Sequence, residues 1–287
     1  MATTPSPESD TSKSDTNGAA SPRRKASPAA VARRPIEAIG SAVIGLVCDL
    51  GGMTLMLGQV LAGLFRRPWR VGLILQQMDF IGVGSAFLVM LTGFFTGMVF
   101  AQQVGSAFAM FSAESLVGPT VVIALTRELA PVFTALMVTM RAGSAISTEL
   151  GTMRVTQQID ALEIMGVNSA GYLILPKILG LITIMPFLVI FSATTGILGA
   201  YATAFIGHVL TPEDLTAGLQ HSFSPWFLWM SIIKSVFFAF IITSVSSFFG
   251  YSVEGGSVEV GKASTAAVVN SSVLILFSDV FLTQLLS

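Results

Sequence analysis

The sequence predicts an all-α membrane protein with five transmembrane helices, and three observations lead to this fold class. Of its 287 residues, 53% are hydrophobic and only 11% are charged, whereas soluble domains carry about 25% charged residues. The mean hydropathy is +0.78. After position 80 the chain contains a series of long apolar runs, and a bilayer is crossed by about 20 helical residues. An ordinary soluble domain is therefore excluded.

The first 35 residues are rich in Ser, Thr, Pro, Ala and Asp and contain few large apolar side chains. Such a segment cannot bury enough surface to offset the entropy of ordering, so residues 1–35 are predicted to be a disordered tail. Their acidic residues and the lack of a following short apolar core fit neither a transit peptide nor a secretory signal. Eight of the fifteen basic residues fall between positions 23 and 70, which the positive-inside rule places in the cytoplasm.

Residues 36–65 are apolar apart from Glu37 and Asp49. Basic residues flank the stretch on both sides, which favours an interfacial helix embedded in the cytoplasmic leaflet without spanning it. A sixth span is the alternative. The single Cys48 lies in this stretch, excludes an intramolecular disulfide and is expected to pack as a reduced side chain.

The remainder, within a predicted membrane domain of residues 36–287, divides into five spans. They are expected at about 80–103, 115–145, 172–207, 225–251 and 266–286. The loops after the first and third spans contain no Lys or Arg, so both are expected outside, with the N-terminus in the cytoplasm and the C-terminus in the periplasm.

The loop after the third span contains a further helix signal and two histidines. Thr211 is a typical N-cap, Pro212 a typical first helical residue, and two acids follow, so a short extracytoplasmic helix is predicted. His208 and His221 have no third ligand at zinc-like spacing, and no metal site is expected.

The segment GGSVEVGKAS, residues 255–264, resembles a nucleotide-binding P-loop. Ala263 stands where the pattern needs Ser or Thr to hold Mg²⁺. The segment is also expected to be a short cytoplasmic loop between two spans, with no room for the strand and helix of a P-loop domain. The chain is therefore predicted not to hydrolyse nucleotide, and no catalytic residue or bound cofactor is expected.

Between the second and third spans, residues 152–166 predict a short amphipathic helix. Val155, Ile159, Leu162 and Gly166 recur at i, i+4, i+7 and i+11. Gly166 is typical of a helix stop, and either Asn168 or Ser169 can cap the next helix. The polar side chains on the other faces are Arg154, Gln157, Gln158, Asp160 and Glu163.

Two interpretations of this helix stay open from periodicity alone. It is either a loop helix lying on the membrane or a coupling helix whose polar face inserts into a groove of a partner ATPase. The coupling interpretation assigns a role to all five polar residues, while the loop interpretation leaves them simply solvated.

Four ionisable residues fall inside predicted spans and need a partner or a water-filled cavity. They are Arg127, Glu128, Lys234 and Asp279. Adjacent residues do not face each other on an α-helix, so Arg127 and Glu128 need not pair together. Either these charges fix spans together, or Arg127 attracts a lipid phosphate. Candidates for the lipid pathway are Phe95, Met98, Val99, Arg127 and Glu128.

Small residues recur every four positions in two places, which lets helices approach closely. They are Gly93 and Gly97 in the first span, and Gly143, Ser147 and Gly151 in and after the second. Packing within one subunit is the expected use, and a seam between two copies is the alternative.

The segment RELAPVFTALMVTMRAGSAISTELGTMRVTQQIDALEIMGV, residues 127–167, resembles the signature of the MlaE (YrbE) family of ABC permeases. The matching elements are R-E-L-x-P-V, R-x-G-S-A, E-[LI]-G-x-M-R-x-T-x-Q-[IL] and E-x-M-x-V. The similarity extends to Gly250-Tyr251 and to residues 261–271, and covers roughly position 35 to the C-terminus. Only the tail lies outside it.

The resemblance implies a substrate class and a set of partners. It implies a homodimer in a bacterial inner membrane that binds cytoplasmic ABC ATPase subunits, which carry the ATP and Mg²⁺, and extracytoplasmic MCE-domain lipid-binding proteins. A small cytoplasmic STAS-domain protein is a further implied partner, and phospholipid is the implied cargo, moved between the inner membrane and the outer envelope. No nucleic-acid partner is expected. The alternative is a free-standing secondary transporter or channel for a small or amphipathic solute.

Overall fold

The computed structural model describes residues 51–58, 60, 71–207, 212–222 and 224–286, and their regular elements are all helices. Five helical segments are long and apolar enough to cross a membrane, which confirms the predicted fold class. They are α2 (Val71–Ala109), a second span over Val117–Val155, α7 (Ser169–Gly207), α9 (Pro225–Tyr251) and α10 (Ser257–Leu286).

Several predictions for the N-terminal part fall outside the described residues. These are the disordered tail, Cys48 and most of the predicted interfacial helix at 36–65; His208 also lies outside. Of the interfacial segment, residues 51–58 are described and are helical. Met56 from this piece is buried in the main hydrophobic core.

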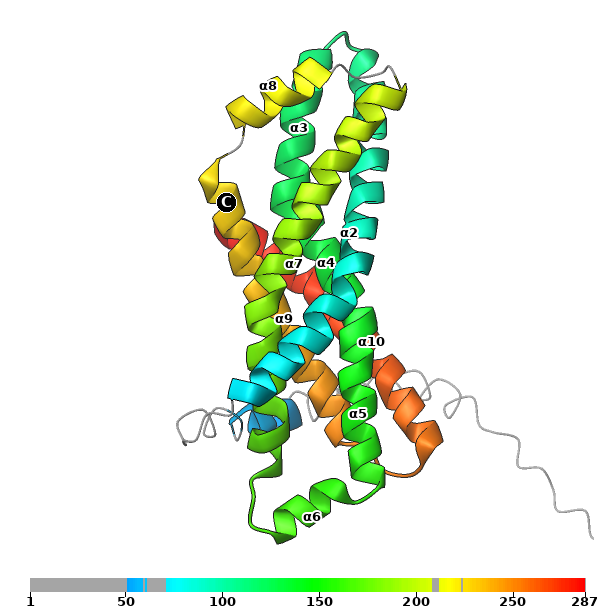
Figure 1. Ribbon diagram of the computed structural model, residues 1–287, viewed down its shortest axis with the longest axis vertical. Helices are drawn as coiled ribbons and strands as arrows, with labels where there is room; N and C mark the ends of the chain where they lie inside the picture. Colours follow the sequence, from blue (N-terminus) through cyan, green and yellow to red (C-terminus); the bar gives the residue numbers. More distant parts are fainter. Residues whose placement is uncertain (1–50, 59, 61–70, 208–211, 223, 287) are drawn as a thin grey trace, which may run out of the picture. The chain divides into compact units, whose positions relative to one another are not determined.

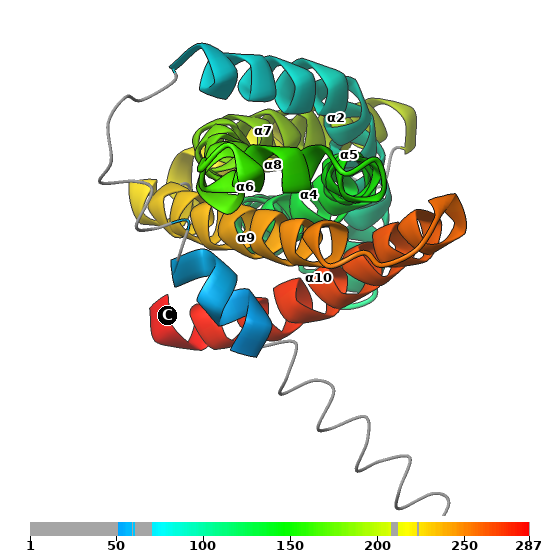
Figure 2. The same ribbon diagram turned by 90° about the horizontal axis from the view of Figure 1, so that it is seen from below.

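The helices pack in layers (Figures 1 and 2). Seen from the end that carries α6 (Gln158–Ile164), α7 and the second span lie between α2 on one side and α9 on the other, and α10 lies beyond α9. The main core fills the space between these layers, with Ile81, Leu181, Met185 and Phe238 fully buried. The outer helices α2 and α10 bury one side and leave large apolar side chains such as Phe87 and Phe277 exposed on the other, which suits an environment of lipid chains.

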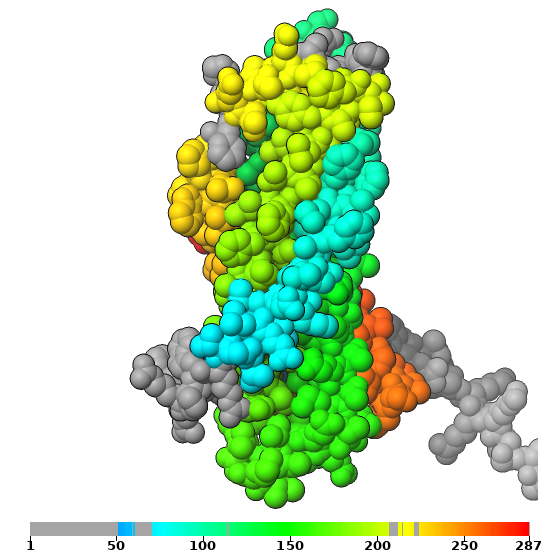
Figure 3. Space-filling view, in the orientation of Figure 1, coloured from blue at the N-terminus to red at the C-terminus, as the bar shows by residue number. Residues whose placement is uncertain are grey.

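The helices α2 and α7 run side by side over most of their length, and on one face they form a continuous surface (Figure 3). Glycines allow this approach. A Cβ on Gly93 would lie 2.7 Å from the carbonyl oxygen of Ser192, and one on Gly97 would collide with the backbone of Gly196. A larger residue at either position would force the two helices apart.

The second span changes its hydrogen-bonding pattern twice. It consists of α3 (Val117–Ala124), η2 (Leu125–Leu129), α4 (Ala130–Val138), η3 (Thr139–Gly143) and α5 (Ser144–Val155), where η2 and η3 are π-helical turns. Such turns are rare and occur often at functional sites. Each of them contains one arginine, Arg127 or Arg141.

Three helices are longer than the spans predicted for them. The first begins at Val71 rather than near 80, the second ends at Val155 rather than near 145, and the last begins at Ser257 rather than near 266. Charged residues such as Asp79 and Lys262 end an apolar run, but they do not end a helix. At about 1.5 Å per residue, a helix of 39 residues is nearly 60 Å long and extends past a hydrocarbon core of about 30 Å.

The segment that resembles a P-loop is therefore not a loop over most of its length. The chain turns at Gly255, whose φ is +124°, and residues 257–264 form the first turns of α10. The preceding regular element is the helix α9 rather than a strand. The expected loop is shortened to residues 252–256, and the backbone cradle of a P-loop is not formed there.

The predicted short helix after the third span is present as α8 (Pro212–Ser222), and it begins at the predicted proline. Gly218 lies against the backbone of Gly118 and Pro119 at the start of the second span. A second core cluster, including Val121, Leu125 and Leu215, lies beneath α8. The α8 end of the molecule thus has its own packed interior.

Candidate functional site

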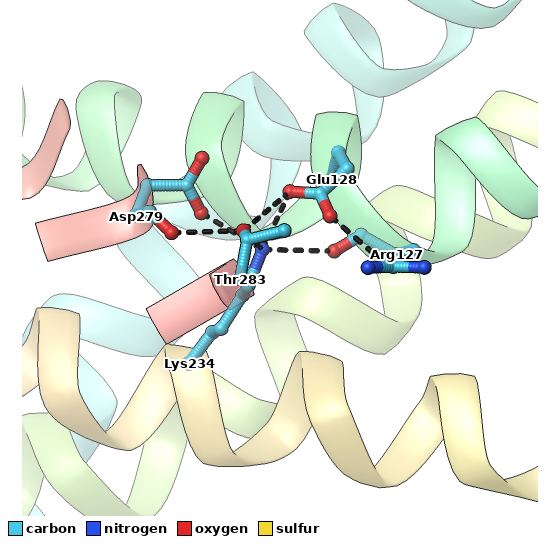
Figure 4. A network of polar contacts seen from close by, with 5 residues as sticks. All are labelled: Arg127, Glu128, Lys234, Asp279 and Thr283. Carbon is cyan, nitrogen blue, oxygen red and sulfur yellow. Dashed lines mark hydrogen bonds and ion pairs between the residues drawn. The ribbon is translucent and has the colours of Figure 1, made fainter. Parts of the chain in front are cut away.

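Lys234, within α9, is fully buried although it carries a charge. Its ammonium Nζ lies 2.5 Å from Glu128 Oε2, 2.9 Å from Asp279 Oδ1 and 2.7 Å from Thr283 Oγ1 (Figure 4). A charge in the hydrocarbon region costs about 2.5–3.5 kcal/mol on insertion scales unless it is satisfied. These contacts satisfy the lysine and join α9 to the second span and to α10.

The π-helical turn η2 and the proline that follows it shape this site. Pro131 has no N–H to donate to the carbonyl oxygen four residues earlier, which belongs to Arg127. The ammonium of Lys234 lies 3.4 Å from that oxygen. The proline thus removes one backbone donor to this oxygen, which accepts a hydrogen bond from the buried lysine.

Arg127 and Glu128 pair with each other in the structure. Arg127 Nε donates to Glu128 Oε1 at 3.1 Å. The expectation that these neighbours need not pair assumed the angular spacing of an α-helix, whereas a π-helical turn holds more residues and separates neighbours by a smaller angle. We call Arg127, Glu128, Lys234, Asp279 and Thr283 the lysine network; its two cations and two carboxylates balance.

The apolar lipid-pathway candidates lie on an exposed strip of α2. Phe95 is 53% and Val99 66% exposed. Met98 and Val99 line an open pocket of about 300 Å³ between α2 and α7, together with Gln102, Gln103, Thr203 and Ile206. Arg127 and Glu128 do not line this pocket. Of the five candidates, Met98 and Val99 therefore line the pocket, Phe95 is exposed on α2 outside the pocket lining, and Arg127 and Glu128 belong to the lysine network.

The small residues singled out in the sequence all lie against other helices of the same chain. Gly93 and Gly97 face α7. A Cβ on Gly143 would lie 2.9 Å from Ser246 Oγ on α9, and one on Gly151 would lie 3.1 Å from Val260 on α10. Ser147 is fully buried beside Gly250.

The predicted coupling segment, residues 152–166, is not one continuous helix. The helix α5 ends at Val155, and Gln157 takes a left-handed conformation with φ of 59° before α6 begins at Gln158. Ile159 is fully buried, whereas Val155 is exposed. The predicted apolar face is therefore split across a turn, and Ile159 is its only buried member.

Both ends of the connection between α6 and α7 follow the predicted turn chemistry. Gly166, with φ of +75°, ends α6, and the N–H groups of Gly166 and Val167 donate to the carbonyls of Glu163 and Leu162 in a Schellman motif. Asn168 caps α7 by accepting a hydrogen bond from Gly171 N at 3.1 Å. Of the two capping candidates, the structure selects Asn168.

The three charged coupling candidates all form contacts within the chain. Arg154 Nη1 lies 2.6 Å from Asp160 Oδ1. Glu163 Oε1 accepts hydrogen bonds from Tyr251 and from Ser169. These two hydrogen bonds, with the nearby charge of Arg154, lower the pKa of Glu163 below its ordinary value.

The α6 end of the molecule is less polar at its outermost part than the sequence suggested. Gln157 and Gln158 are exposed, and Gln158 donates to the hydroxyl of Thr156 at 3.0 Å. Beyond them Ile164 is 87% and Met165 67% exposed. The end of α6 thus presents two large apolar side chains outside the spans.

The sequence did not predict two further polar contacts, an ion pair and a hydrogen bond. Lys177 on α7 is 3% exposed and its Nζ lies 2.5 Å from Glu149 Oε2 on α5. Arg141, in the π-helical turn η3, donates to Ser85 Oγ at 3.1 Å. No local pattern signals either contact, because the partners lie 28 and 56 residues apart in the chain.

Comparisons with known proteins agree along nearly the whole described bundle. The model of the family described as Permease MlaE matches residues 74–285. The chain belongs to the MlaE permease family. A probable ABC transporter permease of Rickettsia bellii is 38% identical over 249 residues, covering 87% of this permease and 96% of the relative. A probable ABC transporter permease of Synechocystis is 34% identical over 212 residues, covering 74% of this permease and 81% of the relative.

A third relative has a more specific name. The intermembrane phospholipid transport system permease protein MlaE of Haemophilus influenzae is 34% identical over 252 residues, covering 88% of this permease and 97% of the relative. The family match includes α2 from residue 74, both π-helical turns and α6. The permease is thus a multi-pass membrane protein related to ABC transporter subunits along nearly its full membrane domain.

Proposed function

We propose that this permease is the membrane subunit of an ABC transporter that moves phospholipid between the inner membrane and the outer envelope of a bacterium. The observation that carries the proposal is the near full-length similarity to the Haemophilus influenzae permease named for intermembrane phospholipid transport. ATP and Mg²⁺ bind to a separate ATPase subunit, because the P-loop likeness of this chain lacks both the hydroxyl and the fold that nucleotide binding needs.

The charge distribution supports an orientation with α6 in the cytoplasm. Arg154, Lys177 and Lys262 all lie near the α6 end of the described bundle, while α8 contains acids and no Lys or Arg. Basic residues are enriched on the cytoplasmic side of membrane proteins. The α8 end then faces the periplasm, where an MCE-domain lipid-binding protein takes up or delivers lipid.

The exposed end of α6 supports docking of the ATPase there. Ile164 and Met165 are exposed and lie outside the five helical segments that are long and apolar enough to span a membrane. Exposed apolar groups outside the membrane are typical of protein interfaces. Gln157 and Gln158 beside them would supply uncharged polar contacts to the ATPase. We propose that a STAS-domain protein also binds on this cytoplasmic side.

The pocket beside Met98 and Val99 is the proposed route for the lipid acyl chains. Its wall is apolar, and Gln102 and Gln103 provide hydrogen-bonding groups at its edge. A second copy of the chain, as the family resemblance implies, would enlarge this open pocket into a shared cavity.

The test is affinity purification of the tagged permease from its own membranes in mild detergent, with mass spectrometry of bound proteins and lipids. We expect a P-loop ATPase, an MCE-domain protein and phospholipid. A Met165→Glu variant is expected to lose the ATPase and keep the MCE-domain protein, while Leu276→Met on the exposed face of α10 serves as the matched control. Recovery of the permease without any ATPase, together with ion-driven uptake by the purified chain alone, would show a secondary transporter instead.

A further inference from the structure

The cytoplasmic end of α9 carries a hydroxyl group that joins three helices. Tyr251, the last residue of α9, donates from its hydroxyl to Glu163 Oε1 on α6 at 2.7 Å. Ser169, the first residue of α7, donates to the same oxygen at 2.8 Å. The two hydroxyl oxygens lie 2.8 Å apart. We call Glu163, Ser169 and Tyr251 the hydroxyl latch.

The ring of Tyr251 is held separately from its hydroxyl. The guanidinium carbon of Arg154 lies 5.7 Å from the centre of the ring, a cation–π distance. Arg154 is itself paired with Asp160 on α6. Removal of the hydroxyl alone would therefore leave the ring contact and the Arg154–Asp160 pair in place.

The latch is built around a charged acceptor. Hydrogen bonds to an ionised group are stronger than bonds between neutral groups. Ser169 is 3% exposed, so one of the two donors to Glu163 is sheltered from water. The hydrogen bonds from Tyr251 and Ser169 lower the pKa of Glu163, which means that both bonds favour the ionised carboxylate.

The helix α9 connects the latch to the lysine network. Lys234 and Tyr251 are 17 residues apart on one uninterrupted helix, a separation of about 26 Å at 1.5 Å per residue. A shift of α9 along its axis would therefore change the position of Lys234 relative to Glu128 and Asp279. One helix thus carries both polar clusters, with Lys234 in its first half and Tyr251 at its last residue.

We propose that Tyr251 is the positioning residue through which a displacement of α6 is transmitted to α9 and from there to the lysine network. The proposal rests on the proposed function, because the displacement would come from the ATPase bound at α6. Ser169 ties α6 to α7, and Tyr251 adds the link to α9, so that two spans move with α6 rather than one.

The first experiment separates transmission from folding. The complete complex is reconstituted in lipid vesicles, and ATP hydrolysis and phospholipid transfer are measured for wild type and for Tyr251→Phe. We expect hydrolysis to continue while the lipid transferred per ATP falls about tenfold, equivalent to about 1.4 kcal/mol. Tyr201→Phe is the matched control, because the Tyr201 hydroxyl makes no hydrogen bond within the described residues.

A second pair of variants tests Glu163, the residue that accepts the hydrogen bond from Tyr251. Glu163→Gln keeps an acceptor oxygen but removes its charge. We expect it to reduce the lipid transferred per ATP less than Tyr251→Phe does. The double variant is expected to be no worse than Tyr251→Phe alone, since the Tyr251–Glu163 hydrogen bond is already absent in that variant. Independent effects that add together would overturn the proposed link.

A third measurement does not depend on transport. Hydrogen–deuterium exchange of the α6 amides is compared between the wild-type permease and the Tyr251→Phe variant in detergent. We expect faster exchange in α6 of the variant and unchanged exchange around Lys234. Three results would each overturn the proposed role of Tyr251. They are unchanged lipid transfer per ATP, a parallel loss of hydrolysis and transfer, and unchanged exchange in α6. If wild type transfers no lipid with ATP while α6 exchange responds as expected, the proposed function fails and the latch stands as a mechanical link.

Discussion

Lys234 and Tyr251 lie on the same helix and each joins three elements, yet their surroundings differ. The ammonium of Lys234 is fully buried and its carboxylate partners are mostly covered, at 33% and 18% exposure for Glu128 and Asp279. Glu163, the acceptor of the hydroxyl latch, is exposed. The lysine network therefore holds the spans together out of reach of water, whereas water can replace the hydrogen bonds of the hydroxyl latch.

The comparison shows that the energetic cost of breaking a charged contact depends on how far the contact is buried. Breaking a buried ion pair leaves an unpaired charge that water cannot reach, so the energetic cost is high. Breaking an exposed pair lets water replace the lost contact, and the cost is low. The latch is therefore a link of low energetic cost between α6 and α9, whereas the lysine network is suited to holding α9 and α10 together.

The largest effect is expected from removal of the buried cation. Lys234→Met keeps the length and apolar stem of the side chain but leaves Glu128 and Asp279 without their shared partner. We expect a loss of about 3–5 kcal/mol of stability, seen as a drop of roughly 10 °C in the unfolding temperature in detergent.

Two variants sharpen this prediction. Lys262→Met removes an ion pair whose cation is 68% exposed, and we expect almost no change in unfolding temperature. Lys234→Met combined with Asp279→Asn restores the charge balance, because Arg127 and Glu128 remain paired, and should recover part of the loss. Equal effects of the Lys234 and Lys262 changes would contradict the assigned difference in burial.

An intermediate effect is expected at Lys177, which is buried like Lys234 but pairs with a half-exposed partner. Glu149 is 48% exposed, so water can solvate its carboxylate when the lysine charge is removed. Lys177→Met should therefore cost about 1 kcal/mol or less, measured by the same thermal unfolding. A loss as large as that of Lys234→Met would show that burial of the cation alone sets the cost.

The sequence predicted the elements of this fold better than their boundaries. Apolar runs located the five spans, and turn chemistry located the start of α8 at Pro212 and the end of α6 at Gly166. The helices extend beyond the predicted spans where a charged residue ended the apolar run but the helix continued, as at Ser257 in α10.

The need for partners in the spans was also predictable, but the partners were not. A buried lysine requires an acceptor, yet Glu128 is 106 residues away in the chain and no local pattern points to it. Thr283 had a local signal, because it follows Asp279 by four residues and so shares its helix face. Likewise, the polar face predicted to meet a partner ATPase is partly used within the chain, because Tyr251 lies 88 residues beyond Glu163.

The smallest effect is expected from the pH dependence of the latch. Hydrogen bonds from Tyr251 and then Ser169 lower the pKa of Glu163, so the ionised form is favoured in the folded state. A group with a lowered folded pKa stabilises the protein above its unfolded pKa, and this contribution is lost as the pH falls through the folded value.

We therefore expect wild type to unfold roughly 1–2 °C above Glu163→Gln at neutral pH, a small difference because Glu163 is exposed. The difference should stay constant down to about pH 5 and then close as the pH falls below the ordinary range of a glutamic acid. Tyr251→Phe should lie between the two, because the Ser169 hydrogen bond still favours the ionised carboxylate. A difference that widened with acidification would mean that Glu163 is held in its neutral form, and the latch would then lack the charged acceptor on which its strength depends.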